Sequence, residues 1–397
     1  MGERFPAVRF EAEFRPTSSG LHYIAINGLG PTKLYIDDQV VISVKFCTDA
    51  MGVLFGGAED KMCQYAFEAG KSYRIRLEST TPTDGGDSGL GAILEGVLAT
   101  RLCFMSQYEY EEDLLSKAVE IAKSVDVVLA FVGNPSVWET EGRDQPTMSL
   151  PASGSQDRLI AAVAAVNPNI IVINSTGSPI TMPWLSKVPA VVQTWFGGQE
   201  SGNSIIDVLF GAVNPSGKLP VSFPKSEQDS ASYGNFPGDP DTDLVTYKEG
   251  IKIGYRYFDE YPEKVAFPFG FGLSYTAFEI GFPSVLQEKL LLTISIEVRN
   301  VGTIDGSEVV QVYTSSPVKT VEMPAKELAA YAKVAVKAGG KEVIELQVEA
   351  EKLAYWDVEN STWVVEKGEY GVWGGNSSAN VNNVGKFVID KTFIFGP

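Results

Sequence analysis

The chain has 397 residues with ordinary shares of hydrophobic (44%) and charged (21%) residues, enough for two or three domains with substantial cores. Its 32 basic and 50 acidic residues give a net charge of −18, which argues against nucleic acid or an anionic membrane as partner, because both bind clustered Lys and Arg. No apolar run is long enough to span a bilayer, and no signal-like apolar segment follows Met1. A neutral ligand such as a sugar is compatible with this charge.

Cysteine and histidine, the residues of many metal and nucleophilic sites, are scarce in this chain. It has three cysteines without metal-ligand spacing and a single histidine, His22. Zinc sites and Ser-His or Cys-His catalysis are therefore poorly supplied. Three N-x-S/T sequons occur, at Asn174, Asn360 and Asn376. Asn174 ends a strand that is predicted to be buried, so glycosylation has modest support.

Residues 1–105 are predicted to form an all-β domain. Apolar and polar residues alternate with a period of two, and turn residues separate the segments at short intervals, which is typical of a β-sandwich. Strands are expected at residues 9–14, 22–26, 33–36 and 72–77. The sequences of residues 16–23, 33–38 and 68–77 resemble the protective-antigen-type lectin-like β domain, which often accompanies carbohydrate-active enzymes. Too little sequence precedes Phe10 for its first strands, so we expect an incomplete lectin-like domain.

The pattern changes between residues 106 and 280, where helices and short apolar strands alternate. Helices are predicted at residues 111–124, 155–166 and 201–210, and strands at 125–132, 169–174 and 190–193. This alternation indicates an α/β sandwich with a mainly parallel sheet. The first strand is apolar and β-branched, so we expect it to be buried. Neither glycine-rich nucleotide motif is present, so no nucleotide site is indicated.

An acidic loop follows the first of these strands. It places Glu139, Glu141, Arg143 and Asp144 next to Trp138. Loops that leave the ends of buried strands often carry the chemistry of α/β folds. A carboxyl group against an aromatic wall can have its pKa raised and serve as a general acid. Taken alone, however, the loop is better interpreted as a solvated acidic segment.

Residues 281–397 return to the all-β pattern. Strands with turns between them are expected at residues 290–299, 307–314, 330–336, 341–348, 362–365 and 370–372. Their number and spacing indicate a second β-sandwich. The predicted fold class is therefore multidomain, α/β plus all-β, with domains at 1–105, 106–280 and 281–397.

Four blocks of sequence resemble the family 3 glycoside hydrolases, whose best-known members are β-glucosidases. Residues 138–151 (WETEGRDQPTMSLP) are similar to a loop of the family's α/β-sandwich domain, and residues 195–224 are similar to a longer motif that contains DVLFG and NPSGKLP. Residues 247–275 resemble a third block. The segments within 298–328 resemble the family's C-terminal fibronectin type III-like domain. As a set these blocks are highly specific, and they reverse the bland interpretation of the acidic loop.

The resemblance implies a retaining mechanism with two carboxylates, one a nucleophile and the other an acid/base, and it implies no metal and no organic cofactor. The family's acid/base is a Glu on the sandwich loop, and motif position assigns it to Glu141. Glu139 is the competing candidate, because residues two apart in an extended loop point in similar directions. Trp138, Arg143 and Asp144 are expected to bind substrate or to orient the loop.

The sequence also departs from the family pattern. The family's nucleophile is an Asp on a (β/α)8 barrel, which needs about 250 residues, and its Ser-Asp-Trp triplet occurs nowhere in this chain. Gln145 stands where the family usually has Arg. We therefore expect a C-terminal portion without a nucleophile, which would need the barrel portion as a partner. Its α/β domain is expected to lack its first strands and to expose unpaired edges and apolar surface.

Two hypotheses follow from these observations. The first is a component of a β-glucosidase, secreted as the family resemblance implies, which hydrolyses terminal β-D-glucosyl residues of β-glucosides or oligosaccharides with retention. The second is a catalytically inactive carbohydrate-binding or interaction module. The resemblance favours the first for the whole protein. The lack of a second carboxylate favours the second for the isolated chain, since double displacement needs both groups.

Overall fold

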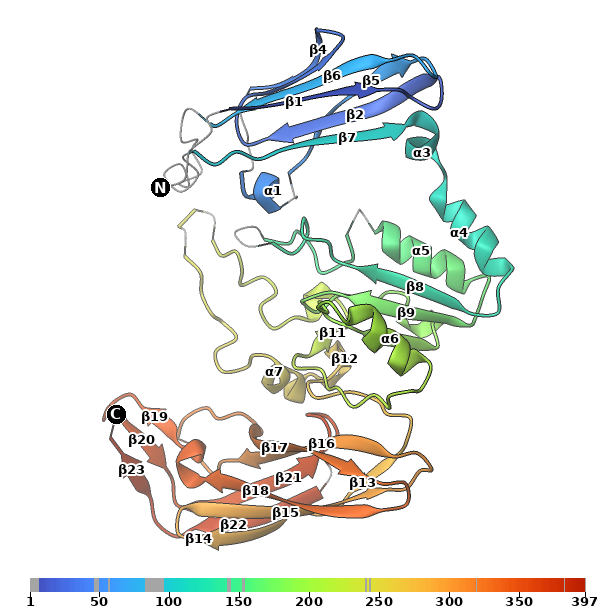
Figure 1. Ribbon diagram of the computed structural model, residues 1–397. Helices are drawn as coiled ribbons and strands as arrows, with labels where there is room; N and C mark the ends of the chain where they lie inside the picture. Colours follow the sequence, from blue (N-terminus) through green and yellow to red (C-terminus); the bar gives the residue numbers. More distant parts are fainter. Residues whose placement is uncertain are drawn as a thin grey trace. The chain divides into compact units, whose positions relative to one another are not determined.

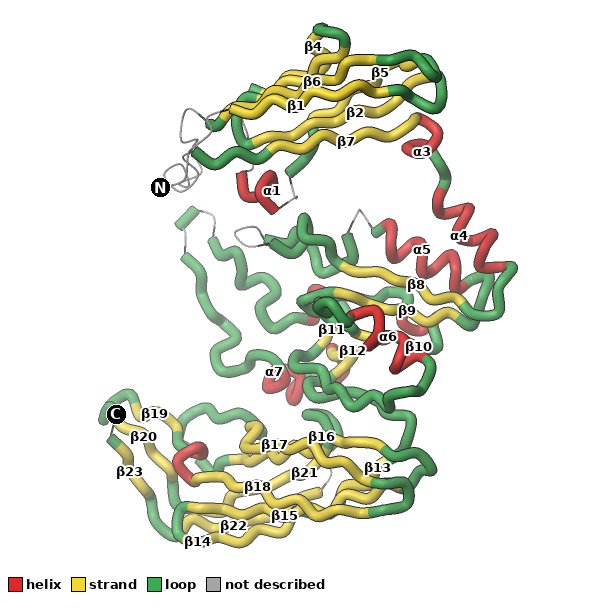
Figure 2. The backbone as a smooth tube through the Cα atoms, viewed as in Figure 1, coloured by secondary structure: helices red, strands yellow, loops and turns green. Residues whose placement is uncertain are grey.

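The computed structural model describes residues 7–45, 50–55, 58–82, 96–140, 144–151, 154–239, 241–242, 244–318, 320–381 and 383–396. The chain divides into two compact units. The first unit comprises Met1–Gly177 with Ser186–Gln193, and the second comprises Ser178–Leu185 with Thr194–Pro397. Strands are found in both units (Figures 1 and 2). Among the described residues, no helix is long and apolar enough to cross a membrane.

The N-terminal part of the first unit is an antiparallel β-sandwich, as predicted. One sheet has the order β1-β6-β3-β4 and the other β5-β2-β7. The strands are β1 (Ala7–Phe14), β2 (Gly20–Gly28), β3 (Thr32–Ile36), β4 (Gln39–Val44), β5 (Lys61–Phe67), β6 (Tyr73–Thr80) and β7 (Thr100–Ser106), with a short helix α1 (Ala50–Phe55). Alternate side chains of both sheets, such as Ile26 and Leu34, form its core. His22 is buried there between Phe67 and Phe104.

The rest of the first unit contains a parallel sheet of the order β10-β9-β8. Its strands are β8 (Val128–Gly133), β9 (Ile170–Ser175) and β10 (Ala190–Gln193), and helices α3 (Gln107–Glu111), α4 (Leu114–Lys123) and α5 (Ser155–Ala164) belong to the same unit. The parallel sheet was predicted. The single helix predicted at 111–124 was wrong at its start, because Asp113 caps a new helix there and accepts a hydrogen bond from the Ser116 N–H.

The expectation that the first parallel strand is buried was wrong for one of its faces. Ala130 and Val132 of β8 are buried, with exposed fractions of 8% and 7%. Leu129 and Phe131, which point to the opposite face, are 37% and 60% exposed. The apolar sequence of β8 is that of a strand covered on both faces, but the described residues of this unit cover only one of them.

The longer segment of the second unit starts at Thr194, and helix α6 (Ser201–Leu209) lies near its beginning. The helix ends just before Gly211, whose φ is +76°. A two-stranded ribbon of β11 (Phe223–Pro224) and β12 (Val265–Phe267) follows, with helix α7 (Tyr255–Glu260) before β12. Most of the described chain between α6 and α7 is loop (Figure 2). Short 3-10 helices occur at Leu185–Lys187, Glu227–Asp229, Pro262–Lys264 and Ala350–Leu353.

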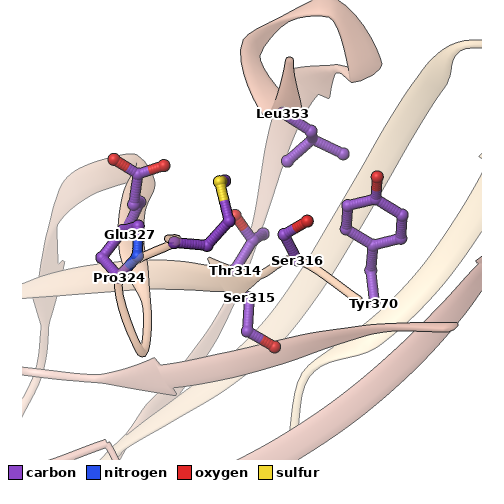
Figure 3. A pocket seen from close by; sticks show the side chains of 8 residues that line it. Thr314, Ser315, Ser316, Pro324, Glu327, Leu353 and Tyr370 are labelled. Carbon is purple, nitrogen blue, oxygen red and sulfur yellow. The ribbon is translucent and has the colours of Figure 1, made fainter. Parts of the chain in front are cut away.

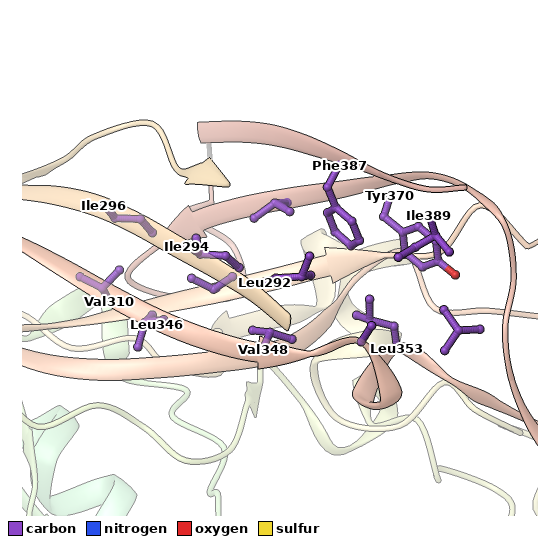
Figure 4. Close-up of a cluster of buried hydrophobic side chains, with 14 of the residues drawn as sticks. Leu292, Ile294, Ile296, Val310, Leu346, Val348, Leu353, Tyr370, Phe387 and Ile389 are labelled. Atoms are coloured by element: carbon purple, nitrogen blue, oxygen red, sulfur yellow. The ribbon is translucent and has the colours of Figure 1, made fainter. Parts of the chain in front are cut away.

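The C-terminal part of the second unit is the second predicted β-sandwich (Figure 1). Its strands are β13 (Phe278–Ile280), β14 (Ser284–Glu288), β15 (Leu291–Asn300), β16 (Gly306–Ser315), β17 (Glu327–Val336), β18 (Lys341–Glu349), β19 (Tyr355–Asp357), β20 (Thr362–Val365), β21 (Gly368–Gly375), β22 (Asn383–Ile389) and β23 (Phe393–Phe395). Side chains such as Ile294, Val310 and Leu346 fill the space between the sheets (Figure 4).

Two buried ion pairs join this sandwich to the loop-rich part of the second unit. Lys218 Nζ lies 2.7 Å from a carboxylate oxygen of Glu308, and both side chains are nearly buried. Lys326 pairs with Asp259 in a similar environment.

The parallel sheet with its helices and the two β-sandwiches confirm the predicted fold class, α/β plus all-β. The boundaries at residues 105 and 280 stay a prediction.

Candidate functional site

The carboxyl ends of the three parallel strands bring polar residues together at one edge of the sheet. The register pairs Gly133 at the end of β8 with Ser175 at the end of β9, and Gln193 at the end of β10 with Asn174. Parallel strands end at the same edge, so the loops that follow them lie near one another. The predicted acidic loop leaves this edge from β8.

The end of β8 is fixed by a side chain from helix α5. Gln156 Oε1 accepts a hydrogen bond from the Gly133 N–H (2.8 Å), and its Nε2 donates to the Gly133 carbonyl oxygen (2.9 Å). The side-chain amide therefore pairs with the strand as another backbone would. A Cβ at Gly133 would lie 2.1 Å from the Ser175 carbonyl oxygen, so the close approach of β8 and β9 here requires glycine.

Directly after β8, Asn134 and Glu139 close a compact turn. The Asn134 N–H donates to the Ser175 carbonyl oxygen at 3.0 Å, and the N–H groups of Trp138 and Glu139 both donate to the Pro135 carbonyl oxygen. The Glu139 carboxylate turns back toward the sheet. It accepts from Asn134 Nδ2 at 2.6 Å and from the Gly177 N–H at 2.9 and 3.1 Å.

A second polar cluster fixes the ends of β9 and β10. Asn174 Nδ2 donates to Gln193 Oε1 at 2.6 Å and to the Thr176 hydroxyl at 3.1 Å. Gln193 Nε2 donates in turn to the Thr176 carbonyl oxygen at 3.1 Å. Asn174 and Thr176 are completely buried. Hydrogen bonds between buried polar groups rigidify a site, so the peptide that precedes Gly177 is held in place by Gln193.

The structure locates only some of the predicted site residues. Glu139 and Trp138 lie at the sheet edge, half-buried, and Asp144 is exposed. The indole N–H of Trp138 is buried and has no hydrogen-bond partner among the described residues. Glu141 and Arg143 lie outside the described residues, as does Gly142 between them. The assignment of the acid/base to Glu141 therefore stays a prediction.

Sequence reasoning missed three residues that build this edge. Asn134, Gln156 and Gly177 hold the loop through the hydrogen bonds given above. The only available signal was the turn sequence Gly133-Asn134-Pro135 directly after an apolar strand. Gln156 and Gly177 carry no local signal, because their role depends on partners far away in the chain.

The second unit holds a small pocket in its β-sandwich (Figure 3). Glu327 and Tyr370 lie on opposite sides of it, with Ser315 and Ser316 between them. Glu327 is paired with Arg256 at 2.7 Å, and burial raises the pKa of Tyr370 to about 12. A neutral phenol and an ion-paired carboxylate offer no obvious catalytic group. No cluster of three potential metal ligands occurs in the part of the chain that the structure describes.

Comparison with protein families identifies two matching domain models. Residues 53–275 match the glycosyl hydrolase family 3 C-terminal domain, and residues 308–378 match the fibronectin type III-like domain. The first match alone covers more than half of the chain.

Curated relatives and solved structures agree with these matches. The chain is 46% identical over 392 residues to beta-glucosidase B of Emericella nidulans, covering 96% of this chain and 46% of that protein. It is 38% identical to a beta-glucosidase of Rhizobium radiobacter, covering 92% of this chain and 44% of the relative. The crystal structure of a beta-glucosidase from Kluyveromyces marxianus in complex with glucose superimposes with a TM-score of 0.86 at 33% identity, covering 98% of this chain and 46% of that one. The chain thus spans about half the length of these relatives.

Proposed function

Because this chain belongs to glycoside hydrolase family 3, we propose that it supplies the acid/base side of a retaining β-glucosidase. Glu141 is the proposed acid/base, on the loop that leaves the carboxyl end of β8. One observation carries the choice between the two glutamates: both oxygens of the Glu139 carboxylate already accept hydrogen bonds from Asn134 or Gly177. A general acid must present a proton to the leaving group, which a carboxylate occupied in this way is poorly placed to do.

The proposed reaction is a double displacement. In the first step a carboxylate nucleophile forms a bond to the anomeric carbon of glucose, and Glu141 gives its proton to the departing glycosidic oxygen. In the second step Glu141 takes a proton from water, whose oxygen displaces the nucleophile and releases glucose with its original configuration. The nucleophile is proposed to be an Asp in polypeptide outside these 397 residues, about 5–5.5 Å from Glu141 as retaining enzymes require.

The remaining predicted site residues receive supporting roles in this proposal. The half-buried indole of Trp138 offers an apolar face, which suits the apolar face of a sugar ring. Arg143 and Asp144 are proposed to orient the loop. The substrate is a terminal β-D-glucosyl residue of a glucoside or oligosaccharide, and the protein is proposed to act outside the cell. No cofactor is needed, since both groups of the mechanism are carboxyls.

A second function is favoured for the chain by itself. Without the nucleophile, the same surface could hold a sugar but could not complete a double displacement. A catalytically inactive carbohydrate-binding or interaction module is therefore the alternative. The chain covers only 46% of beta-glucosidase B, which keeps this alternative in consideration.

The first experiment treats the purified chain with an aryl β-glucoside and with a 2-fluoro-glucoside that traps a glycosyl-enzyme, and records its intact mass. No turnover and no mass gain are expected. A covalent adduct mapped to this chain would contradict the proposal, because it would locate a nucleophile here. Binding of glucose, measured by calorimetry on the same sample, would favour the binding-module alternative.

The second experiment tests the acid/base directly. The matched C-terminal part of beta-glucosidase B is replaced by this chain, and the chimera is assayed on glucosides with good and poor leaving groups. We expect turnover, and we expect Glu141→Ala to lower it by about 10²–10⁴-fold on poor leaving groups, with azide restoring activity on activated ones. Glu120→Ala is the matched control, because this exposed Glu lies on helix α4 and pairs there with Lys123. An active chimera that Glu141→Ala leaves unchanged would overturn the assignment.

A further inference from the structure

The carboxylate of Glu139 connects three segments at the carboxyl edge of the parallel sheet. Glu139 lies at the start of the acidic loop, and its carboxylate accepts hydrogen bonds from Asn134 after β8 and from Gly177 after β9. We propose that Glu139 is a positioning residue, which anchors the loop to the sheet and thereby sets the place of Glu141. Its catalytic consequence rests on the proposed function. The anchor itself is a property of the fold and can be tested separately.

The geometry of the carboxylate supports an anchoring role. Its Oε1 accepts from Asn134 Nδ2 at 2.6 Å and from the Gly177 N–H at 3.1 Å, while its Oε2 accepts from the same N–H at 2.9 Å. Hydrogen bonds to an ionised acceptor are about twice as strong as neutral ones. Asn134 is only 6% exposed, so water competes poorly for its amide.

Both donors are themselves fixed by the sheet. The backbone N–H of Asn134 donates to the Ser175 carbonyl oxygen at 3.0 Å, which continues the pairing of β8 with β9. On the other side, the carbonyl of Thr176 accepts from Gln193 Nε2, which holds the peptide whose N–H belongs to Gly177. The Glu139 carboxylate is therefore held by two donors whose positions are set by β8, β9 and β10.

The position of Glu139 in the sequence gives the anchor its consequence. Only Thr140 separates it from Glu141, so their Cα atoms are at most about 7 Å apart even in an extended chain. We therefore expect that loss of the anchor at Glu139 also disturbs the position of Glu141. Acid catalysis is sensitive to such shifts, since a misplacement of about 1 Å can cost about 10²-fold in rate.

Amide hydrogen exchange of the isolated chain tests the anchor without any activity. In Glu139→Ala, the Gly177 amide and the peptide around residues 138–147 are expected to exchange about tenfold faster or more, because the N–H loses a charged acceptor. Glu120→Ala, which removes an exposed acid on α4, should leave these peptides unchanged. Equal protection in the wild type and in Glu139→Ala would overturn the anchor.

A reciprocal exchange of donor and acceptor guards against simple misfolding. Asn134→Asp alone places two carboxylates face to face and should weaken the anchor. The double variant N134D/E139Q restores a donor and an acceptor across the same 2.6 Å contact and leaves an amide oxygen for the Gly177 N–H. Protection of Gly177 is expected to return at least halfway. No recovery in a folded double variant would contradict the pairing.

Kinetics of the chimera then separate positioning from acid catalysis. Glu139→Ala is expected to lower kcat by about 10²-fold with little change in KM, and azide should not restore it. Azide rescue of Glu139→Ala, rather than of Glu141→Ala, would make Glu139 the acid/base and overturn both the inference and the assignment. An inactive chimera would count against the proposed function alone, because the exchange experiment still decides the anchor.

Discussion

At the scale of single residues, Gly133 sets how closely β8 and β9 approach at the edge that carries the acidic loop. An added Cβ would meet the Ser175 backbone oxygen at 2.1 Å, and backbone atoms cannot move aside as a flexible side chain can. We expect Gly133→Ala to lower the free energy of unfolding by about 1–3 kcal/mol through overpacking.

The matched control for this substitution is Gly198→Ala, where nothing lies within 4 Å of the added Cβ. Urea titrations of both variants, followed by tryptophan fluorescence, measure the difference. The close approach would be refuted if the two substitutions cost the same. The loop should also loosen in Gly133→Ala, which the exchange of the Gly177 amide would report.

Individual residues also show where motif matching stops being informative. Asn174 fits a glycosylation sequon, yet it is completely buried, and its amide donates to Gln193 and Thr176. The amide of Asn376 donates to Glu308, and that of Asn360, which is exposed in a turn, donates to Asp357. A sequon specifies residue types, but only the fold decides whether the amide is accessible.

At the scale of elements, capping separates two helices where one was predicted. Ser106 and Glu109 form a capping box at the start of α3, and Asp113 caps α4. Both capping signals are present in the sequence, whereas the apolar periodicity of residues 114–122 indicates a helix without marking its first residue. Capping residues decide where a helix begins, while periodicity indicates only that one exists.

The cap of α4 gives a pH dependence whose sign follows from the Asp113 carboxylate. The hydroxyl and then the N–H of Ser116 hold the pKa of Asp113 below its ordinary value of 3.8. A depressed pKa in the folded state means that the carboxylate stabilises α4 fully above the ordinary pKa, and that this contribution is lost as the pH falls through the folded value.

Asp113→Asn is the matched variant, since its amide oxygen can still cap the helix but does not titrate. We expect the stability difference between the wild type and Asp113→Asn to favour the wild type more at about pH 6 than at about pH 3, as measured by urea unfolding. A difference that is the same at both values would show that the charge does not stabilise the cap.

The strands and helices of the α/β segment could largely be predicted, because each follows from a local pattern. β9 and β10 lie within one residue of their predicted bounds. The partners of Glu139 could not be predicted in the same way. Gly177 lies 38 residues further along the chain, and a glycine N–H has no sequence signature. Long-range hydrogen bonds depend on the register of the sheet, which one sequence does not specify.

At the scale of the whole molecule, one face of β8 exposes apolar side chains to solvent. Val127, Leu129 and Phe131 are 52%, 37% and 60% exposed. β8 is an edge strand of the parallel sheet, and no described strand pairs with its outer edge. An apolar edge strand with one bare face is a site for association with other polypeptide. An exposed apolar face in the α/β segment was expected from the sequence.

We therefore expect the isolated chain to self-associate as its concentration rises, and Phe131→Lys to suppress the association. The thermal midpoint should change little, because a substitution at an exposed position usually alters stability by no more than about 0.5 kcal/mol. Val358→Lys is the control, since Val358 is 79% exposed but lies in a turn of the second unit. Sedimentation velocity over a concentration series measures the effect. A wild-type chain that stays monomeric throughout would remove the premise.

The chimera with beta-glucosidase B makes the opposite prediction for the same residue. If the additional polypeptide covers β8, Phe131 becomes buried there, and Phe131→Lys should destabilise the chimera by several kcal/mol, because an unpaired charge would be enclosed in apolar surroundings. The substitution thus improves the behaviour of the isolated chain and damages the longer one. Thermal unfolding of both pairs distinguishes a face that is covered by the rest of the enzyme from one that serves only for self-association. If Phe131→Lys leaves the thermal midpoint of the chimera unchanged, the face serves only for self-association.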